Sequence, residues 1–127
     1  MQPEDRQKDR DAGYLWDMLD ATQNIVQFTT GISVGEYLKD RKLQLAVERS
    51  LEIIGEAAKK VSLDFQQDNP GIPWNKIIAQ RNVIAHEYGE IKQERIWTVV
   101  TLHIPGLMEK LDSMVQSFEE NEIEPVI

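Results

Sequence analysis

The sequence has no cysteine among its 127 residues, so it can form neither a disulfide framework nor a metal site made of thiolates. It also lacks any apolar stretch close to the roughly 18 residues that a membrane-spanning helix requires. The first residues, MQPEDRQKDRD, are charged and contain no apolar segment, which argues against a secretory signal peptide. These absences predict a cytoplasmic protein with no membrane partner.

Basic residues are scarce as well. The chain has 14 Lys and Arg against 22 Asp and Glu, a net charge of −8. Affinity for nucleic-acid backbones comes mainly from clustered Lys and Arg, so a general nucleic-acid binder is excluded and no DNA partner is expected. Any contact with RNA must therefore be local. A protein with a basic surface is an equally plausible partner for this acidic chain.

Helical periodicity fills the rest of the chain. With 127 residues and 41% hydrophobic content, the chain has the size and composition of one soluble domain, 1–127, whose core spans about 9–119. Apolar residues recur at steps of three and four, and Gly and Pro interrupt them, which predicts helices over 9–29, 40–61, from Pro73 to just before Gly89, 93–102 and 104–119. The segment 62–72 is expected to be a loop and 120–127 an acidic tail. The predicted fold is therefore an all-α, up-and-down bundle of four to five helices.

The helix over 40–61 has the clearest apolar stripe, and two residues widen its apolar face. Leu45 and Ile53 lie off the main stripe. A helix covered in this way usually meets neighbours on two sides. One of those neighbours could belong to a second chain.

The stretch QRNVIAHEYGE, residues 80–90, carries an unusual set of polar side chains near a helix end. Each residue of a helix advances 100°, so Arg81 and Tyr88 return to nearly the same face, whereas His86 lies roughly 140° from Arg81. Arg81 and His86 can meet if the helix loosens near His86, close to Gly89. They can also meet if two copies of the helix face each other across a two-fold axis.

The pattern Arg-x-x-x-x-His-x-Tyr, formed by Arg81, His86 and Tyr88, resembles the signature of the HEPN superfamily. It is most similar to the HepT branch, the toxins of type VII-like toxin–antitoxin pairs whose antitoxin is a minimal, MntA-type nucleotidyltransferase. The likeness covers nearly the whole chain, including the segments LQLAVERSLEIIGEAAKKVS, IPWNKIIAQRNVIAHEYGEI, IWTVV and IPGLMEKL.

The resemblance implies a HEPN-like helical homodimer that cleaves RNA without a metal ion or a cofactor. Arg81 and His86 would be its catalytic residues, with Asn82 as a polar support. Tyr88 would be the residue to which the cognate nucleotidyltransferase attaches AMP, silencing the toxin. The net charge of −8 is the feature that fits an RNA substrate least well.

The same chemistry can be argued from the residue types. RNA carries its own nucleophile, the 2′-hydroxyl, so cleavage needs proton transfer and charge stabilisation. A histidine can act as acid or base near neutral pH, and a guanidinium can bind two phosphate oxygens. Cleavage in line requires both an acid and a base, yet each chain offers one suitable histidine, His86. Two copies in a dimer would supply both.

Simpler interpretations stand beside these. His86 alone would often be a surface histidine at a helix end, where its cation is favoured, and His103 is expected to be structural. The carboxylates Glu48, Glu52 and Glu56 recur every four residues. They form either a solvated row, with Glu56 paired to Lys59 or Lys60, or a support in which Glu52 or Glu56 holds Arg81 or His86. The tryptophans are expected to be core aromatics: Trp16, Trp74 and Trp97.

A second class of function also fits the motif. The chain could be a non-catalytic helical partner, or nucleotide-binding subunit, of a nucleotidyltransferase, to which it presents Tyr88. Arg81 would serve either role, because it can hold a phosphate of RNA or of ATP. His86 separates the two, since acid–base catalysis requires it and phosphate docking does not.

Overall fold

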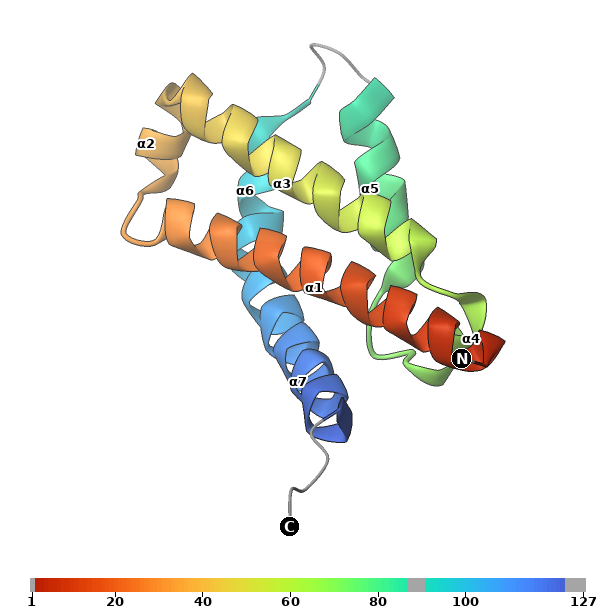
Figure 1. Cartoon of the computed structure of the whole chain (residues 1–127). Coiled ribbons are helices and arrows are strands. Elements are labelled where there is room, and N and C mark those ends of the chain that lie inside the picture. The colour runs from red at the N-terminus through yellow and green to blue at the C-terminus, as the bar shows by residue number, and fades with distance from the viewer. Residues whose placement is uncertain (1, 87–90, 123–127) are drawn as a thin grey trace.

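The computed structural model describes residues 2–86 and 91–122, and helices make up most of that part of the chain (Figure 1). In chain order, the helices of the described residues are α1 (Pro3–Thr29), α2 (Val34–Lys39), α3 (Arg41–Lys60), α4 (Leu63–Asp68), α5 (Trp74–His86), α6 (Gln93–Leu102) and α7 (Ile104–Glu122). No strand occurs among the described residues, so the predicted all-α class is confirmed.

The predicted count of four to five helices is wrong, because two short helices occupy segments expected to be irregular. At α2 a capping box overcomes the helix-breaking tendency of Gly35: the Ser33 hydroxyl accepts from the Glu36 N–H, and the Glu36 carboxylate accepts from the Ser33 N–H. At α4 the hydroxyl of Ser62 accepts from the Phe65 N–H. Two local N-caps thus start two short helices, which are too short to show a periodic apolar pattern in the sequence.

The start of α1 also lies earlier than the predicted residue 9. Pro3 occupies the first turn, where its missing N–H costs nothing. Farther along α1, the buried carboxylate of Asp11 accepts hydrogen bonds from the Ser62 N–H at 2.9 Å and the Ser62 hydroxyl at 2.7 Å. This contact ties the first half of α1 to the start of α4.

The main packing pairs join helices that are not consecutive in the chain. The closest pairs are α1 with α3, α3 with α5, and α1 with α7. In Figure 1, α1 and α3 run side by side in opposite directions, α5 crosses one end of α3, and α6 and α7 follow one another behind α1. The break between α6 and α7 falls at His103, and Pro105 sits in the first turn of α7. In the part of the chain that the structure describes, no helix has the length and apolarity needed to cross a membrane.

The core confirms the apolar stripes, with one error. Trp74 is buried and Trp97 is half-buried against Tyr37, but Trp16 is 47% exposed and does not belong to the core. Leu45 is 50% exposed, so the widened apolar face of α3 is open in the single chain. Whether a second copy covers that face stays a prediction.

A partly buried chain of hydrogen bonds fixes the start of α6 against α2 and α3. The hydroxyl of Tyr37, fully buried, donates to Gln93 at 2.6 Å, and the Gln93 amide donates to Glu48 at 3.1 Å. Arg41 donates to the same Glu48 oxygen at 3.2 Å. Burial raises the pKa of Tyr37 well above its usual value, the nearby Glu48 charge adds to this, and Arg41 opposes it. Tyr37 therefore remains a neutral donor in the folded protein.

We expect Tyr37→Phe to lower the free energy of unfolding by about 0.5–1.5 kcal/mol at pH 7, because it removes the hydrogen bond to the half-buried Gln93 oxygen. Above pH 10 or so, the unfolded chain loses the tyrosine proton while the folded chain keeps it, so wild-type stability falls. Tyr37→Phe has no tyrosine at this position to titrate, so the difference in free energy of unfolding between wild type and variant should narrow as pH rises. Urea unfolding of both proteins from pH 7 to pH 11 measures it; a gap that stays constant or widens would contradict this role.

Candidate active site

The position of Arg81 is set by a close crossing of α3 and α5. A Cβ placed on Gly55 would overlap the Cβ of Arg81, would lie 2.8 Å from its Cγ, and would lie 3.2 Å from the carbonyl oxygen of Ile77. Only a glycine on α3 therefore allows α5 to approach this closely. The crossing places the base of the Arg81 side chain directly against the α3 backbone.

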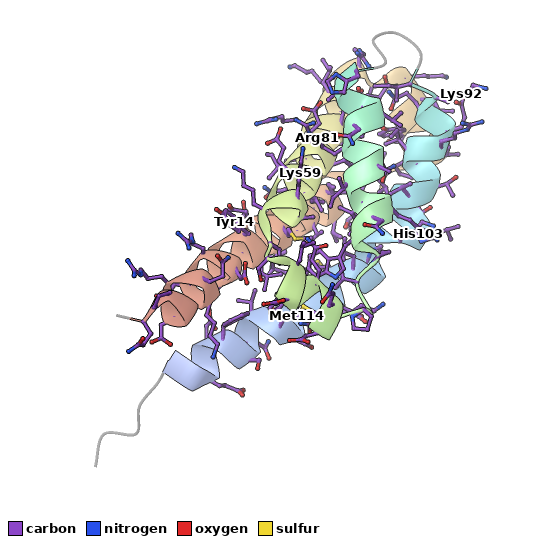
Figure 2. The ribbon with its side chains drawn as sticks, turned by 90° about the vertical axis from the view of Figure 1, so that its right-hand side faces the viewer. Tyr14, Lys59, Arg81, Lys92, His103 and Met114 are labelled. Carbon is purple, nitrogen blue, oxygen red and sulfur yellow. The ribbon has the colours of Figure 1, made fainter. Side chains whose placement is uncertain are left out.

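The guanidinium of Arg81 emerges between the two helices (Figure 2). Its Nη1 donates to Oδ1 of Asn82 at 3.2 Å, and its Nη2 lies 3.8 Å from Oε1 of Glu56. The second distance is that of an ion pair rather than a hydrogen bond. Its Nε is buried and has no hydrogen-bond partner among the described residues. Because a guanidinium has five N–H donors, most of its donor capacity is still available to a ligand.

The carboxylates of α3 divide among different partners. Glu56 contacts Arg81 and also Arg49, whose Nη1 is 3.4 Å away, whereas Glu52 contacts Arg49 at 3.3 Å. Of the three carboxylates in this row, Glu56 is the one that reaches Arg81 among the described contacts. Glu48 points instead into the buried network at the start of α6.

His86 is the last residue of α5 and is exposed. The helix stays regular up to this residue, so Arg81 and His86 lie about 140° apart around the axis and about 7.5 Å apart along it. The first of the two routes by which they could meet, a loosened helix within one chain, is therefore absent up to His86. Tyr88 and Gly89 lie outside the described residues.

A hollow formed by the described residues lies apart from Arg81, Asn82 and His86. This hollow of about 480 Å³ opens between α5, α6 and α7 and is lined by Ile77 and Gln80 but not by Arg81, Asn82 or His86. Arg81 instead lies at the crossing of α3 and α5, and His86 is exposed at the end of α5. Among the described side chains, no group of three or more His, Asp or Glu residues is placed to hold a metal ion.

Sequence reasoning missed two residues of this surface, Gly55 and Arg49. Gly55 interrupts the strongest amphipathic helix of the chain, and an unexplained glycine at such a position indicates a close approach of another backbone. Arg49 stands three residues before Glu52 and seven before Glu56, spacings that place all three side chains on neighbouring turns of one helix face. The sequence contains both the unexplained glycine and the Arg49 spacing, but it does not show which helix packs against them.

Comparisons with known proteins agree with this architecture. The family model described as Ribonuclease HepT-like matches residues 18–114. A protein of Thermococcus cleftensis named a probable ribonuclease HepT is 38% identical over 101 residues, covering 80% of this chain and 92% of that protein. A protein of Methanocaldococcus jannaschii, named as a candidate RNase, is 36% identical over 106 residues, covering 84% and 88%. A candidate RNase of Caldanaerobacter subterraneus is 33% identical over 103 residues, covering 81% and 92%. No solved structure matches the chain.

The fold and the surface around Arg81 define a small all-helical protein that presents an arginine and a histidine on one helix. The family match covers more than half of the chain, and two of the relatives named above are more than 35% identical over at least four-fifths of it. The chain belongs to the HepT-like ribonuclease family, so the resemblance read from the sequence is confirmed.

Proposed function

We propose that this chain is a metal-independent endoribonuclease and the toxin of a toxin–antitoxin pair. The observation that carries the proposal is the Arg81 guanidinium, which the α3–α5 crossing holds at the surface with most of its donors unused, on the helix that ends in the exposed His86. Membership of a ribonuclease family and the RNase names of several relatives support it.

In the proposed reaction, one His86 removes the proton of a ribose 2′-hydroxyl, and the resulting oxygen attacks the adjacent phosphorus. The bond from phosphorus to the 5′-oxygen of the next nucleotide breaks, and a second His86 gives that oxygen a proton. The products are a 2′,3′-cyclic phosphate and a 5′-hydroxyl. Arg81 stabilises the negative charge that gathers on the phosphate oxygens in the transition state.

Two histidines require two chains, so the proposal includes a symmetric homodimer. The exposed strip of α5 fits such an interface, because it combines the small Ala79 with Asn82, His86 and Val83, a valine that is 46% exposed. Leu45 on α3 provides a further exposed apolar side chain. Apposition of two α5 helices along this strip would bring both copies of His86 into one interface without bending either helix. Arg81 points away from the strip, toward α3, and would reach the interface from the α3–α5 crossing through its long side chain.

The deciding experiment is cleavage of single-stranded RNA by purified protein in the presence of EDTA, after intact-mass analysis has shown that no AMP is attached. We expect fragments that end in 2′,3′-cyclic phosphate and begin with 5′-hydroxyl. If AMP-free, dimeric protein leaves RNA intact, the ribonuclease assignment fails and the non-catalytic partner of a nucleotidyltransferase becomes the better account.

The proposal also includes control by a cognate MntA-type nucleotidyltransferase that attaches AMP to Tyr88. The phenol oxygen would attack the α-phosphorus of ATP, pyrophosphate would leave, and the phenol proton would pass to a base of the transferase. Each AMP adds bulk and negative charge beside a surface intended for phosphate, which excludes RNA by volume and by repulsion.

Co-expression with the cognate transferase should therefore raise the intact mass by one or more AMP units, and Tyr88→Phe should abolish the shift. Tyr14→Phe is the matched control, because Tyr14 lies on α1 and is not part of the motif. A shift that survives in Tyr88→Phe and disappears in Tyr14→Phe would refute Tyr88 as the acceptor.

A further inference from the structure

Two arginines from different helices converge on a single carboxylate oxygen. Nη1 of Arg49, on α3, lies 3.4 Å from Oε1 of Glu56, and Nη2 of Arg81, on α5, lies 3.8 Å from the same atom. The Arg49 side chain is 60% exposed and Arg81 is half-buried, so solvent reaches the pair from one side. An anionic oxygen held between two guanidinium groups is the arrangement by which proteins bind phosphate.

We propose that Arg49 and Arg81 together form a binding site for one backbone phosphate of RNA, which the Glu56 carboxylate occupies until RNA displaces it. The inference rests on the proposed ribonuclease function and adds to it a residue outside the motif. Arg49 would bind substrate, and Glu56 would be an internal competitor rather than a catalytic acid or base.

The strength of the contacts favours displacement. At 3.8 Å the Glu56–Arg81 pair forms no hydrogen bond, and partly exposed ion pairs of this kind contribute about 0–1 kcal/mol. When Glu56 swings away, Arg49 still contacts Glu52 at 3.3 Å, so it does not become an unpaired charge in the free protein. A phosphate that accepts from both guanidinium groups can therefore replace the carboxylate at little cost.

Such a site also accounts for RNA binding by an acidic chain. The net charge is −8, yet Arg49 and Arg81 balance Glu52 and Glu56 on this surface, which makes the patch locally neutral before RNA arrives. Moving one carboxylate aside leaves a local positive charge where the phosphate binds. The chain then needs no general affinity for nucleic acid.

The test measures binding of a fully 2′-O-methylated RNA oligonucleotide, which keeps its phosphates but lacks the attacking hydroxyl, to the full-length, AMP-free protein at several salt concentrations. Arg49→Gln should weaken binding several-fold and reduce the slope of log affinity against log salt by about 0.7, the loss of one phosphate contact to a single strand. Arg10→Gln, which removes the same charge from an exposed position on α1, is the matched control. Cleavage of unmodified RNA by the wild type is followed in parallel.

Glu56→Gln is expected to have the opposite effect on RNA binding to Arg49→Gln. It should tighten binding of the 2′-O-methylated RNA by up to about fivefold, because the competing ion pair is gone, whereas Glu109→Gln on the exposed side of α7 should change it less. If the ion pairs only held the helices together, both Arg49→Gln and Glu56→Gln would lower stability and neither would change the salt slope relative to its control.

The outcomes separate the inference from the proposed function. If the wild type cleaves RNA while Arg49→Gln matches Arg10→Gln in affinity and slope, the two-arginine site is refuted and the ribonuclease stands. If Glu56→Gln weakens binding, Glu56 is a support and not a competitor, and the inference fails in that form. If the wild type neither binds nor cleaves RNA, both are refuted.

Discussion

Replacing His86 with alanine is expected to lower the rate of RNA cleavage by about 10⁴-fold or more. A positioned acid or base typically contributes 10²- to 10⁴-fold, and in a symmetric dimer one substitution removes both of them. His86 is exposed at the end of α5, so its loss should leave the fold and the dimer intact. Single-turnover cleavage by AMP-free protein, with size-exclusion chromatography to verify the dimer, measures the effect.

The second histidine of the chain supplies the matched control. His103 is also exposed but lies in the turn between α6 and α7, beside the hollow that contains none of Arg81, Asn82 or His86. His103→Ala should therefore cleave RNA at the wild-type rate. Full activity in His86→Ala would remove the acid–base role and leave docking of a nucleotidyltransferase as the better account of the motif.

Mixing subunits tests whether both copies of His86 act on one phosphate. Wild-type and His86→Ala chains are unfolded together and refolded at known ratios, and cleavage is measured against the wild-type fraction. If both histidines are needed, activity follows the square of the wild-type fraction, and an equal mixture retains about one quarter of the wild-type activity. If each chain works alone, activity falls in direct proportion and the equal mixture retains about one half, which would exclude a shared site.

The sequence was most informative where one helix buries one face. Apolar residues at helical spacing, with Gly and Pro at the interruptions, predicted the five longer helices to within a few residues, except at the start of α1. The stripe of α3 was the clearest of these patterns. The two short helices were missed because Ser33 and Ser62 create them through local hydrogen bonds, which leave no periodic pattern. Trp16 was wrongly predicted to be a core residue. It lies beside the apolar stripe of α1, and the sequence does not show whether another helix covers that side.

The candidate site was predictable in its residues but not in its contacts. Arg81 and His86 stood out as an odd pair near a helix end, and helix geometry already showed that one regular helix does not aim them at one spot. The convergence of Arg49 and Arg81 on Glu56 depends on how α3 and α5 cross, which no spacing within either helix encodes. That crossing is fixed by a glycine, so its removal should disturb both the fold and the site.

Gly55→Ala is expected to lower the free energy of unfolding by about 2 kcal/mol, a net of steric overlap and improved helix propensity. The added methyl would overlap the Cβ of Arg81, which cannot rotate away because it is attached directly to the α5 backbone. Forcing an extra methyl into a packed contact typically costs about 1–3 kcal/mol, and larger values occur when backbones must separate. The gain from replacing a helical glycine offsets at most about 1 kcal/mol of this.

Gly13→Ala is the control that isolates the crossing. Gly13 lies within α1, and a Cβ there would meet nothing within 4 Å, so only the propensity gain of about 0.5–1 kcal/mol should be seen. Urea unfolding of the two variants should thus change stability in opposite directions. Gly55→Ala should also reduce cleavage beyond its effect on folding, because separating α3 from α5 moves the Arg81 guanidinium away from Arg49, with which it is proposed to bind phosphate.

A double-mutant cycle identifies Arg81 as the residue that Gly55 accommodates. In an Arg81→Gly background the overlapping Cβ is absent, so adding Gly55→Ala should cost far less than it does in the wild type. The remaining contact, 3.2 Å from the Ile77 carbonyl oxygen, is tight but not an overlap. A coupling free energy of about 1–3 kcal/mol would verify the crossing. A cycle with no coupling, or a Gly55→Ala protein as stable as Gly13→Ala, would mean that α3 and α5 lie farther apart and that Gly55 does not place the arginine.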